Sequence, residues 1–124
     1  MLAEFENAVE KLQTLKNSQQ FRQVYEQGQV FHTSLFSAFF LKVETEERRI
    51  GITVTRKIGN AVIRNRCKRR LREALRKQFG EFESLLGFDL VINAKSNLVN
   101  AEFSSIQETL AKTLKRFAGS TSKS

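Results

Sequence analysis

The chain has 124 residues, of which 40% are hydrophobic, and it carries a formal net charge of +8. This length fits one domain with a single core, and the lone cysteine excludes an internal disulfide. The N-terminus lacks the features of a secretory signal, and no apolar run reaches the roughly 18 residues that a membrane-spanning helix needs. We therefore expect a soluble cytoplasmic protein whose positive charge favours a polyanionic partner.

Two helical patterns open the chain. Between residues 1 and 16, apolar residues recur at three- and four-residue spacing, which indicates a short amphipathic helix or a flexible lead-in. Asn17 or Ser18 can cap a second helix, and Gly28 stands where a left-handed C-cap glycine would end it. The apolar face of this second helix contains Phe21, Val24 and Tyr25.

Strand patterns follow in three places. Residues 30–43 are rich in aromatic and branched side chains, and RRIGITVT, residues 48–55, alternates apolar with small polar residues. The acidic stretch at residues 44–47 lies between them, so the simplest interpretation is an antiparallel pair joined by a charged turn. Further on, FDLVINA from Phe88 to Ala94 indicates a buried strand.

The C-terminal segment carries a helical stripe behind a possible cap at Asn100. The stripe contains Phe103, Ile106, Leu110, Leu114 and Phe117. The tail GSTSKS, residues 119–124, has nothing apolar to pack and is expected to be disordered. The order helix, strands, basic segment, strand, helix predicts an α+β sandwich.

The excess positive charge lies in one segment, from Arg56 to Lys77. It contains ten Lys or Arg and one acid, Glu73, whereas the rest of the chain contains 11 bases and 12 acids. At about 100° per residue, its apolar residues form a band of Ile63, Cys67, Leu71, Ala74 and Leu75. The opposite side gathers Asn65, Arg69, Arg72 and Arg76. A run of charged residues often marks only a solvated helix face. Here the charges are of one sign, most of them are arginine, and the opposite face is core, which favours bidentate phosphate binding. The segment therefore predicts a nucleic-acid-binding helix.

The segment IGITVTRKIGNAVIRNRCKRRLREALR, residues 50–76, resembles the signature of the bacterial ribonuclease P protein family. The positions that carry the signature are Ala61, Val62, Ile63, Arg64, Asn65, Arg66, Lys68, Arg69, Leu71 and Arg72. FRQVYEQG, FDLVINAK and LAKTLKR are similar, in the same order, to the family's first helix, last strand and final helix. Cys67 stands where the family usually has Ile, Leu or Val. The resemblance predicts one α-β RNA-binding domain over about residues 15–118, with an N-terminal extension at 1–14 and the tail at 119–124.

This resemblance implies a two-layer α-β sandwich, in which helices pack on a small mixed sheet and a left-handed β-α-β crossover carries the basic helix. It also implies the protein subunit of the ribonucleoprotein endoribonuclease that removes the 5′ leader from precursor tRNA. In such an enzyme the catalytic centre and its Mg²⁺ belong to the RNA, so no catalytic residue is expected in the protein. The protein binds the catalytic RNA and the leader, which broadens substrate recognition, and one protein per RNA is expected.

Site residues follow from the resemblance, position by position. The residues expected to contact the catalytic RNA or the substrate backbone are Arg56, Lys57, Asn60, Arg64, Asn65, Arg66, Lys68, Arg69 and Arg72. A cleft for the single-stranded leader would be lined by Phe21, Tyr25, Ser37, Phe39, Thr53 and Lys95. Unpaired bases stack on aromatic rings at about 1–3 kcal/mol each, although most of the 11 Phe must be core residues, and Phe21 fits that role equally well.

Two other function classes make different demands on the sequence. A protein nuclease needs clustered carboxylates, but Asp89 is the only aspartate and the glutamates are scattered. A non-enzymatic RNA-binding module, such as a ribosomal or RNA-chaperone protein, fits the charge map equally well, and only the signature separates it from the family. Cys67 has no Cys or His partners at zinc-ligand spacing, and His32 receives no role.

Overall fold

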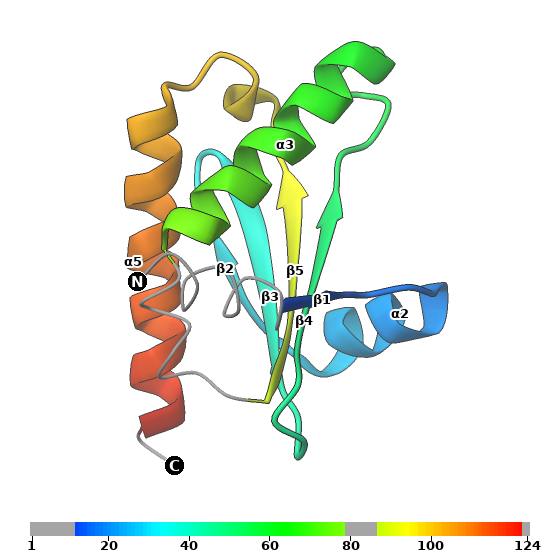
Figure 1. Ribbon diagram of the computed structural model, residues 1–124, viewed down its shortest axis with the longest axis vertical. Coiled ribbons are helices and arrows are strands. Elements are labelled where there is room, and N and C mark those ends of the chain that lie inside the picture. Colours follow the sequence, from blue (N-terminus) through cyan, green and yellow to red (C-terminus); the bar gives the residue numbers. More distant parts are fainter. Residues whose placement is uncertain (1–11, 79–86, 123–124) are drawn as a thin grey trace, which may run out of the picture.

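A computed structural model of the protein describes residues 12–78 and 87–122. In these residues, five strands form one mixed sheet in the order β1-β4-β5-β3-β2 (Figure 1). The strands are β1 (Leu12–Thr14), β2 (Gln29–His32), β3 (Phe36–Lys42), β4 (Arg48–Thr53) and β5 (Phe88–Ala94). The helices are α2 (Ser18–Gln27), α3 (Ala61–Lys77), α5 (Phe103–Ser122) and the short 3-10 helix η1 (Ser96–Leu98). The α+β class expected from the element order is confirmed.

β5 occupies the centre of the sheet. It pairs with β3 in antiparallel and with β4 in parallel orientation. All side chains from Phe88 to Ile92 are buried, which is typical of a strand that is covered on both faces. The buried strand predicted at residues 88–94 is therefore confirmed.

The predicted pairing of residues 30–43 with residues 48–55 is wrong. The first of these segments contains two strands, β2 and β3, which pair with each other in antiparallel orientation. β3 and β4 do run in opposite directions, but β5 lies between them and pairs with both. A β3–β4 hairpin would have left one edge of β5 without a partner, and unpaired backbone groups in a buried strand are costly.

The two faces of the sheet are covered unequally. α3 and α5 pack on one face, where they form the main core with side chains of β3, β4 and β5. In this core the Phe40 ring stacks on Phe88 and Phe117, with centroid distances of 5.3 and 4.4 Å. α2 packs on the opposite face, where Val24 is buried in a smaller cluster with Leu15. α2 therefore adds a partial layer to the expected two-layer sandwich.

β4, α3 and β5 form a crossover between neighbouring parallel strands. In Figure 1 both strands run upward, α3 crosses in front of the sheet, and β5 lies to the left of β4. This arrangement is left-handed, whereas about 98% of such units are right-handed. The left-handed crossover implied by the family resemblance is therefore present, and it places α3 beside α5.

β1 extends the sheet beyond β4. It pairs with β4 in parallel orientation, and Leu15 N then donates a hydrogen bond to Ile50 O at 3.0 Å. The helix predicted over residues 1–16 is wrong for Leu12–Thr14, because the open edge of β4 offers backbone partners that favour an extended chain. The rest of that prediction, residues 1–11, lies outside the described residues.

α2 begins at a capping box and ends at a tight contact. Asn17 Oδ1 accepts a hydrogen bond from Gln20 N at 2.9 Å, so the predicted N-cap is confirmed. Gly28 ends the helix, but its φ of −80° is extended rather than left-handed as predicted. A Cβ at Gly28 would lie 2.5 Å from Val24 O and 2.9 Å from Phe40 O. Close packing against β3 therefore explains the glycine.

α5 begins later than predicted. The Glu102 carbonyl accepts hydrogen bonds from two amides of the first turn, so the helix starts at Phe103 and Asn100 is not its cap. The buried positions of the predicted stripe are Ile106, Leu110, Leu114 and Phe117. α5 continues to Ser122, so the chain is helical through most of the tail that was expected to be disordered. The last two residues lie outside the described part of the chain.

An ion pair links β4 and β5 on the face that α2 covers. Arg49 Nε and one terminal nitrogen each donate to a different carboxylate oxygen of Asp89, both at 2.7 Å. The Asp89 side chain is 1% exposed. The hydrogen bond to Asp89 is the main reason why the pKa of Arg49 is raised above its ordinary value, and burial of the guanidinium opposes that shift. The only aspartate of the chain therefore has a structural partner for both oxygens.

Arg70 holds the segment between β5 and α5 against α3. Its guanidinium donates to the carbonyl oxygens of Leu98, at 3.3 Å, and Ala101. Hydrogen bonds from charged groups contribute more than neutral ones. Unlike its exposed neighbour Arg69, this cation of α3 is therefore part of the fold.

We expect Arg70→Ala to lower the free energy of unfolding by about 2 kcal/mol, because two carbonyls lose a charged donor. Arg69→Ala is the matched control on the next residue, and its effect should stay within about 0.5 kcal/mol, as is usual for exposed positions. Urea denaturation followed by circular dichroism measures both variants. Equal stability of the two variants would contradict a structural role for Arg70.

Candidate nucleic-acid interface

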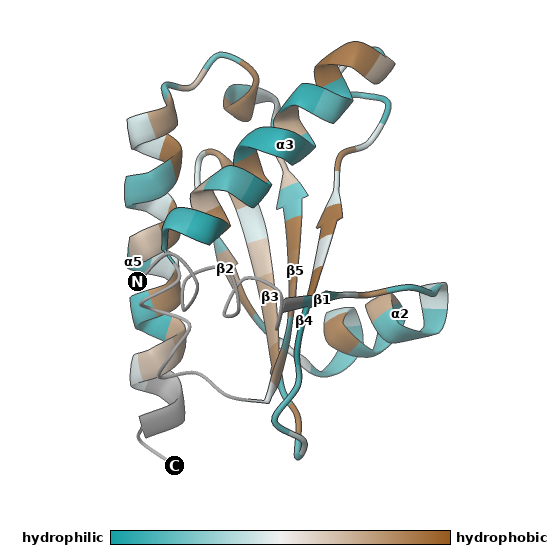
Figure 2. Cartoon of the chain, viewed as in Figure 1, coloured by the Kyte–Doolittle hydropathy of each residue, from teal (hydrophilic) through white to brown (hydrophobic). Residues whose placement is uncertain are grey.

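α3 is an amphipathic helix whose position is fixed by its apolar band. Asn60 caps its start, since its Oδ1 accepts a hydrogen bond from Ile63 N at 3.0 Å. The Ile63 side chain packs at the margin of the core. The buried residues of the helix are Cys67, Leu71, Ala74 and Leu75. The predicted band is therefore confirmed, and Figure 2 shows the outer side of α3 as mostly hydrophilic.

Cys67 serves as a small core residue. Its side chain is buried, and this burial raises the pKa of the thiol above its ordinary value, although the charges of Arg70 and Arg66 oppose the shift. A protonated, buried thiol packs like an apolar group. The departure from the family pattern at this position therefore leaves the core under α3 intact.

α3 and the loop before it carry all of the predicted RNA-contact residues. The exposed ones are Arg56, Lys57, Asn60, Asn65, Arg66, Arg69 and Arg72. The half-buried ones are Arg64 and Lys68. Two of the nine also stabilise the start of the helix, namely the Asn60 cap and Arg64, whose guanidinium donates to Gly59 O at 3.2 Å.

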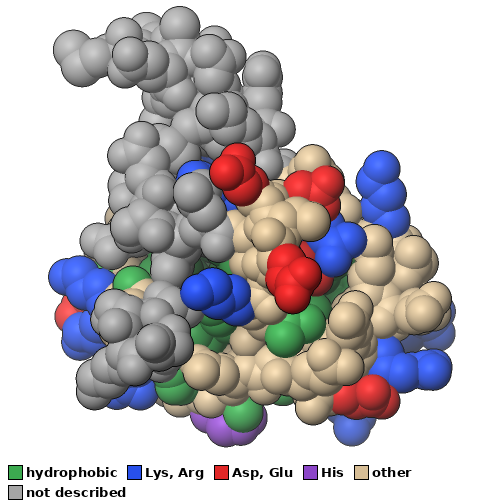
Figure 3. Space-filling model, turned by 90° about the horizontal axis from the view of Figure 1, so that it is seen from below, with side chains coloured by type: hydrophobic (Ala, Val, Ile, Leu, Met, Phe, Trp, Pro, Cys, Tyr) green, Lys and Arg blue, Asp and Glu red, His purple; other side chains and the backbone are tan. Residues whose placement is uncertain are grey.

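Charges of one sign dominate this helix. The only acid in α3, Glu73, lies 3.3 Å from Arg76 near the end of the helix. At the opposite end of the molecule, seen in the coloured part of Figure 3, Asp and Glu side chains lie among Lys and Arg side chains. The positive field is therefore localised to α3, where it attracts polyanions. Val62, which is 77% exposed, adds an apolar side chain near these cations.

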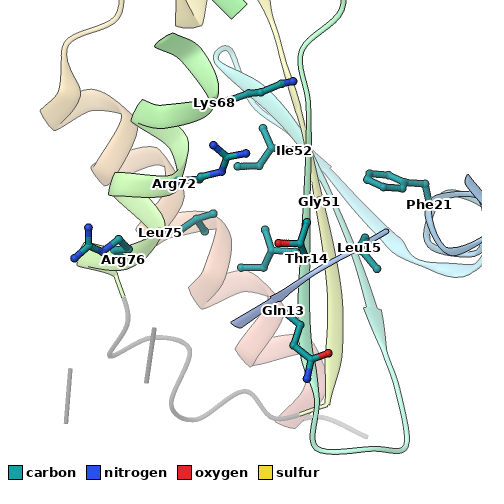
Figure 4. A pocket seen from close by; sticks show the side chains of 11 residues that line it. Gln13, Thr14, Leu15, Phe21, Gly51, Ile52, Lys68, Arg72, Leu75 and Arg76 are labelled. Carbon is teal, nitrogen blue, oxygen red and sulfur yellow. The ribbon is translucent and has the colours of Figure 1, made fainter. Parts of the chain in front are cut away.

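A pocket of about 290 Å³ lies between α3 and the edge of β4 (Figure 4). Its charged residues come from successive turns of α3 and are Lys68, Arg72 and Arg76. Its apolar lining includes Ile50, Ile52 and Leu75. Phe21 closes the far side, where a Cβ on Gly51 would approach the ring to 2.5 Å. Cations beside an apolar surface suit a nucleotide, and only two of these residues belong to the predicted RNA-contact set.

The face of the sheet toward α2 gathers the predicted leader-cleft residues. Tyr25 is 38% exposed, and its ring meets the half-buried Phe39 edge to face at a centroid distance of 4.8 Å. A second pocket is lined by Ser18, Phe21, Arg22, Tyr25 and Thr53. Ser37 lies on the same face, beside Phe39 on β3. Lys95 follows β5, and its Nζ donates to Thr33 O at 2.6 Å. The structure therefore brings Phe21, Tyr25 and Thr53 into one pocket, with Phe39 against Tyr25, whereas Ser37 and Lys95 do not line that pocket. Phe21 also serves the small core under α2.

Two polar residues of this face were missed as site residues. Asn93 on β5 accepts a hydrogen bond from the Tyr25 hydroxyl at 3.0 Å. His32 on β2 lies with Nδ1 2.7 Å from Ser37 Oγ. The alternation in FDLVINA, which places Asn93 on the same side as Asp89, was the available signal. Strand register decides which residues they meet, and register is not visible in one sequence.

The only aspartate of the chain is engaged within the fold. Both oxygens of Asp89 accept hydrogen bonds from Arg49. No three His, Cys, Asp or Glu side chains within residues 12–78 and 87–122 are grouped so that they could hold a metal ion. In the same part of the chain, every helix is too short or too polar to cross a bilayer. The arrangement is suited to binding a charged polymer.

Known proteins resemble this chain in sequence. The family model described as Ribonuclease P matches residues 9–118. The chain is similar to the ribonuclease P protein component of Carboxydothermus hydrogenoformans, with 40% identity over 102 residues that cover 81% of this chain and 86% of the relative. The corresponding protein of Finegoldia magna is 35% identical over 102 residues, which cover 82% and 88% of the two chains.

Solved structures agree in fold. The RNase P protein from Thermotoga maritima has a TM-score of 0.75 and 30% identity, over 84% of this chain and 96% of that one. The RNase P protein of Staphylococcus aureus has a TM-score of 0.71 and 28% identity, over 82% and 92%. The matched residues include the whole sheet and α3. The chain therefore belongs to the ribonuclease P protein family.

Proposed function

We propose that this chain is the protein subunit of ribonuclease P, which removes the 5′ leader from precursor tRNA, and that it docks on the catalytic RNA through α3. The observation that carries the proposal is the positive outer face of a helix whose other face is core. The family match over residues 9–118 supports the subunit role. The RNA holds the catalytic centre, and the protein supplies binding and orientation.

The proposed RNA contacts act mainly by neutralising phosphates. They are Arg56, Lys57, Asn60, Arg64, Asn65, Arg66, Lys68, Arg69 and Arg72. Arg66, Arg69 and Arg72 succeed one another at three-residue spacing, so their charges repel in the free protein. RNA phosphates relieve that repulsion and release counterions, which makes the affinity depend steeply on salt.

The α2-facing side of the sheet takes the single-stranded leader in this proposal. Exposed parts of Tyr25 and Phe39 offer ring faces or edges on which unpaired bases can stack. Arg22 at the pocket wall and Lys95 at the end of β5 supply charge for the leader phosphates. Ser37 and Thr53 add hydroxyl groups between them.

Mg²⁺ belongs to the RNA in this proposal. Ions held by RNA phosphates would supply charge stabilisation for phosphodiester hydrolysis. The side chains of the described residues do not fit such an ion. Asp89 accepts hydrogen bonds from Arg49, and no three His, Cys, Asp or Glu side chains in this part of the chain are grouped to hold a metal. We propose one protein per catalytic RNA, acting in the cytoplasm.

The direct test incubates purified protein with precursor tRNA and Mg²⁺, with and without the RNA subunit of ribonuclease P. We expect the protein alone to leave the precursor intact, and the protein with RNA to produce the mature 5′ end faster than RNA alone. Cleavage by the protein alone would contradict the division of labour. No effect on the RNA-catalysed rate would favour a non-enzymatic RNA-binding module.

Binding to the catalytic RNA should weaken about tenfold for Arg69→Ala, and the slope of log affinity against log salt should fall by about 1. Arg69 is suited to this test because its exposed side chain makes no hydrogen bond or ion pair within residues 12–78 and 87–122, unlike Asn60 and Arg64. Lys115→Ala on the exposed side of α5 removes the same charge elsewhere and should leave affinity nearly unchanged. Filter binding at several salt concentrations measures both. Equal losses for the two variants would show that α3 is not the docking surface.

A further inference from the structure

The pocket between α3 and the edge of β4 lies where β1 ends (Figure 4). β1 pairs with β4 from Arg48 to Ile50, and Leu15 N then donates a hydrogen bond to Ile50 O. Beyond this point the chain leaves the sheet and enters α2. In the described part of the chain, the rest of this edge of β4 therefore has no strand beside it. The pocket opens onto an uncovered strand edge.

Ile52 presents its backbone at this uncovered edge. Backbone groups of alternate residues in a strand point to the same edge, and Ile50 O points toward β1, because it accepts the hydrogen bond from Leu15 N. The N–H and C=O groups of Ile52 therefore point the same way, toward the space beyond the end of β1. Gly51 also lines the pocket, and without a side chain it can do so only through its backbone. The strand edge thus offers the pocket one hydrogen-bond donor and one acceptor.

The helix wall of the pocket carries positive charge without a compensating acid. Lys68, Arg72 and Arg76 follow one another at four-residue spacing, which is about 6 Å of rise per step. In Figure 4, Lys68 and Arg72 extend from α3 toward β4. No Asp or Glu is among the described lining residues, and neither Lys68 nor Arg72 has an ion-pair partner within residues 12–78 and 87–122. Lys68 is half-buried, so an anion from a ligand would stabilise its charge.

The rest of the lining is largely apolar. Side chains of Leu15, Ile50, Ile52 and Leu75 form it, and the Phe21 ring closes the far side. The volume of about 290 Å³ is at the lower end of the range for small-molecule sites. An inorganic anion would leave the apolar wall and the strand edge without a partner, and an apolar ligand would leave the cations without one. A heterocyclic base joined to phosphates matches all three parts of the pocket.

We propose that this pocket binds a free nucleoside polyphosphate. Its base lies against the apolar wall with one edge toward the backbone of Ile52, and its phosphates lie along Lys68, Arg72 and Arg76. Lys68 and Arg72 also belong to the proposed RNA contacts, so a bound nucleotide competes with the catalytic RNA for two cations. Only this competition rests on the proposed function, because the nucleotide site itself requires no RNA.

Isothermal titration calorimetry of the full-length protein without RNA tests the site. We expect ATP to bind at one molecule per protein, and adenosine, tripolyphosphate and the dinucleotide ApA to bind about tenfold more weakly or less. Tripolyphosphate carries no less negative charge than ATP but has no base, so equal affinity for the two would reduce the site to charge attraction and overturn the inference. Equal affinity for ATP and ApA would overturn it as well, because it would assign the pocket to a nucleotide within RNA. Absence of saturable ATP binding is the third contradicting result.

Two charge variants of α3 separate the pocket from the general field of the helix. Arg72→Gln removes a cation that lines the pocket, and it should weaken ATP binding about fivefold or more. Arg66→Gln is the matched control, because this exposed arginine does not line the pocket and lies about 120° around the helix from Arg72. Its affinity for ATP should stay within about twofold of the parent. Circular dichroism checks the fold of both variants, and equal losses of affinity would contradict a site in the pocket.

Filter binding of the catalytic RNA to the parent protein tests the competition. Free Mg²⁺ and ionic strength are held constant, because ATP binds the ion and salt alone weakens RNA binding. We expect saturating ATP to weaken RNA binding about threefold or more, and adenosine at the same concentration to leave it unchanged. Unchanged RNA affinity in ATP would contradict the shared use of Lys68 and Arg72. Failure of RNA docking through α3 is distinguishable, since calorimetry would then still detect ATP binding to the protein alone.

Discussion

β5 can be buried only if both of its edges and both of its faces are covered. All side chains from Phe88 to Ile92 are inaccessible to solvent, and unpaired backbone groups in such a strand would be costly. β3 and β4 take the two edges, α3 and α5 cover one face, and α2 covers part of the other. The requirement to cover β5 therefore places the basic helix α3 on one side of the sheet and the predicted leader-cleft residues on the other.

The two proposed RNA-binding sides would act through different interactions. In this proposal, the positive charge of α3 binds phosphates without regard to sequence, and this binding weakens with salt. The rings of Tyr25 and Phe39 on the other side would stack on unpaired bases, which is a short-ranged contact. Under this proposal, affinity for the large RNA and binding of the leader can vary independently.

The sequence predicted features that depend on local periodicity and failed for those that depend on distant partners. The apolar and charged faces of α3 follow from a 3.6-residue pattern, and β5 follows from the mostly apolar segment FDLVINA. The order of strands was missed because residues 30–43 carry no signal that β5 will insert beside them. The contact between His32 and Ser37 was missed for a related reason, since only strand register brings these two residues together. The candidate RNA contacts came from the family signature.

Site-specific cross-linking tests the separation of the two surfaces most directly. A photoreactive benzoylphenylalanine can replace Arg69 on the outer face of α3, or Val30, which is 40% exposed on β2 beside the cleft. Each protein would be irradiated in a complex of the catalytic RNA with a precursor tRNA whose leader carries a 5′ label. If the two surfaces bind separate RNA segments, position 69 will label the catalytic RNA and position 30 will label the leader. Cross-links from both positions to the same RNA segment would contradict it.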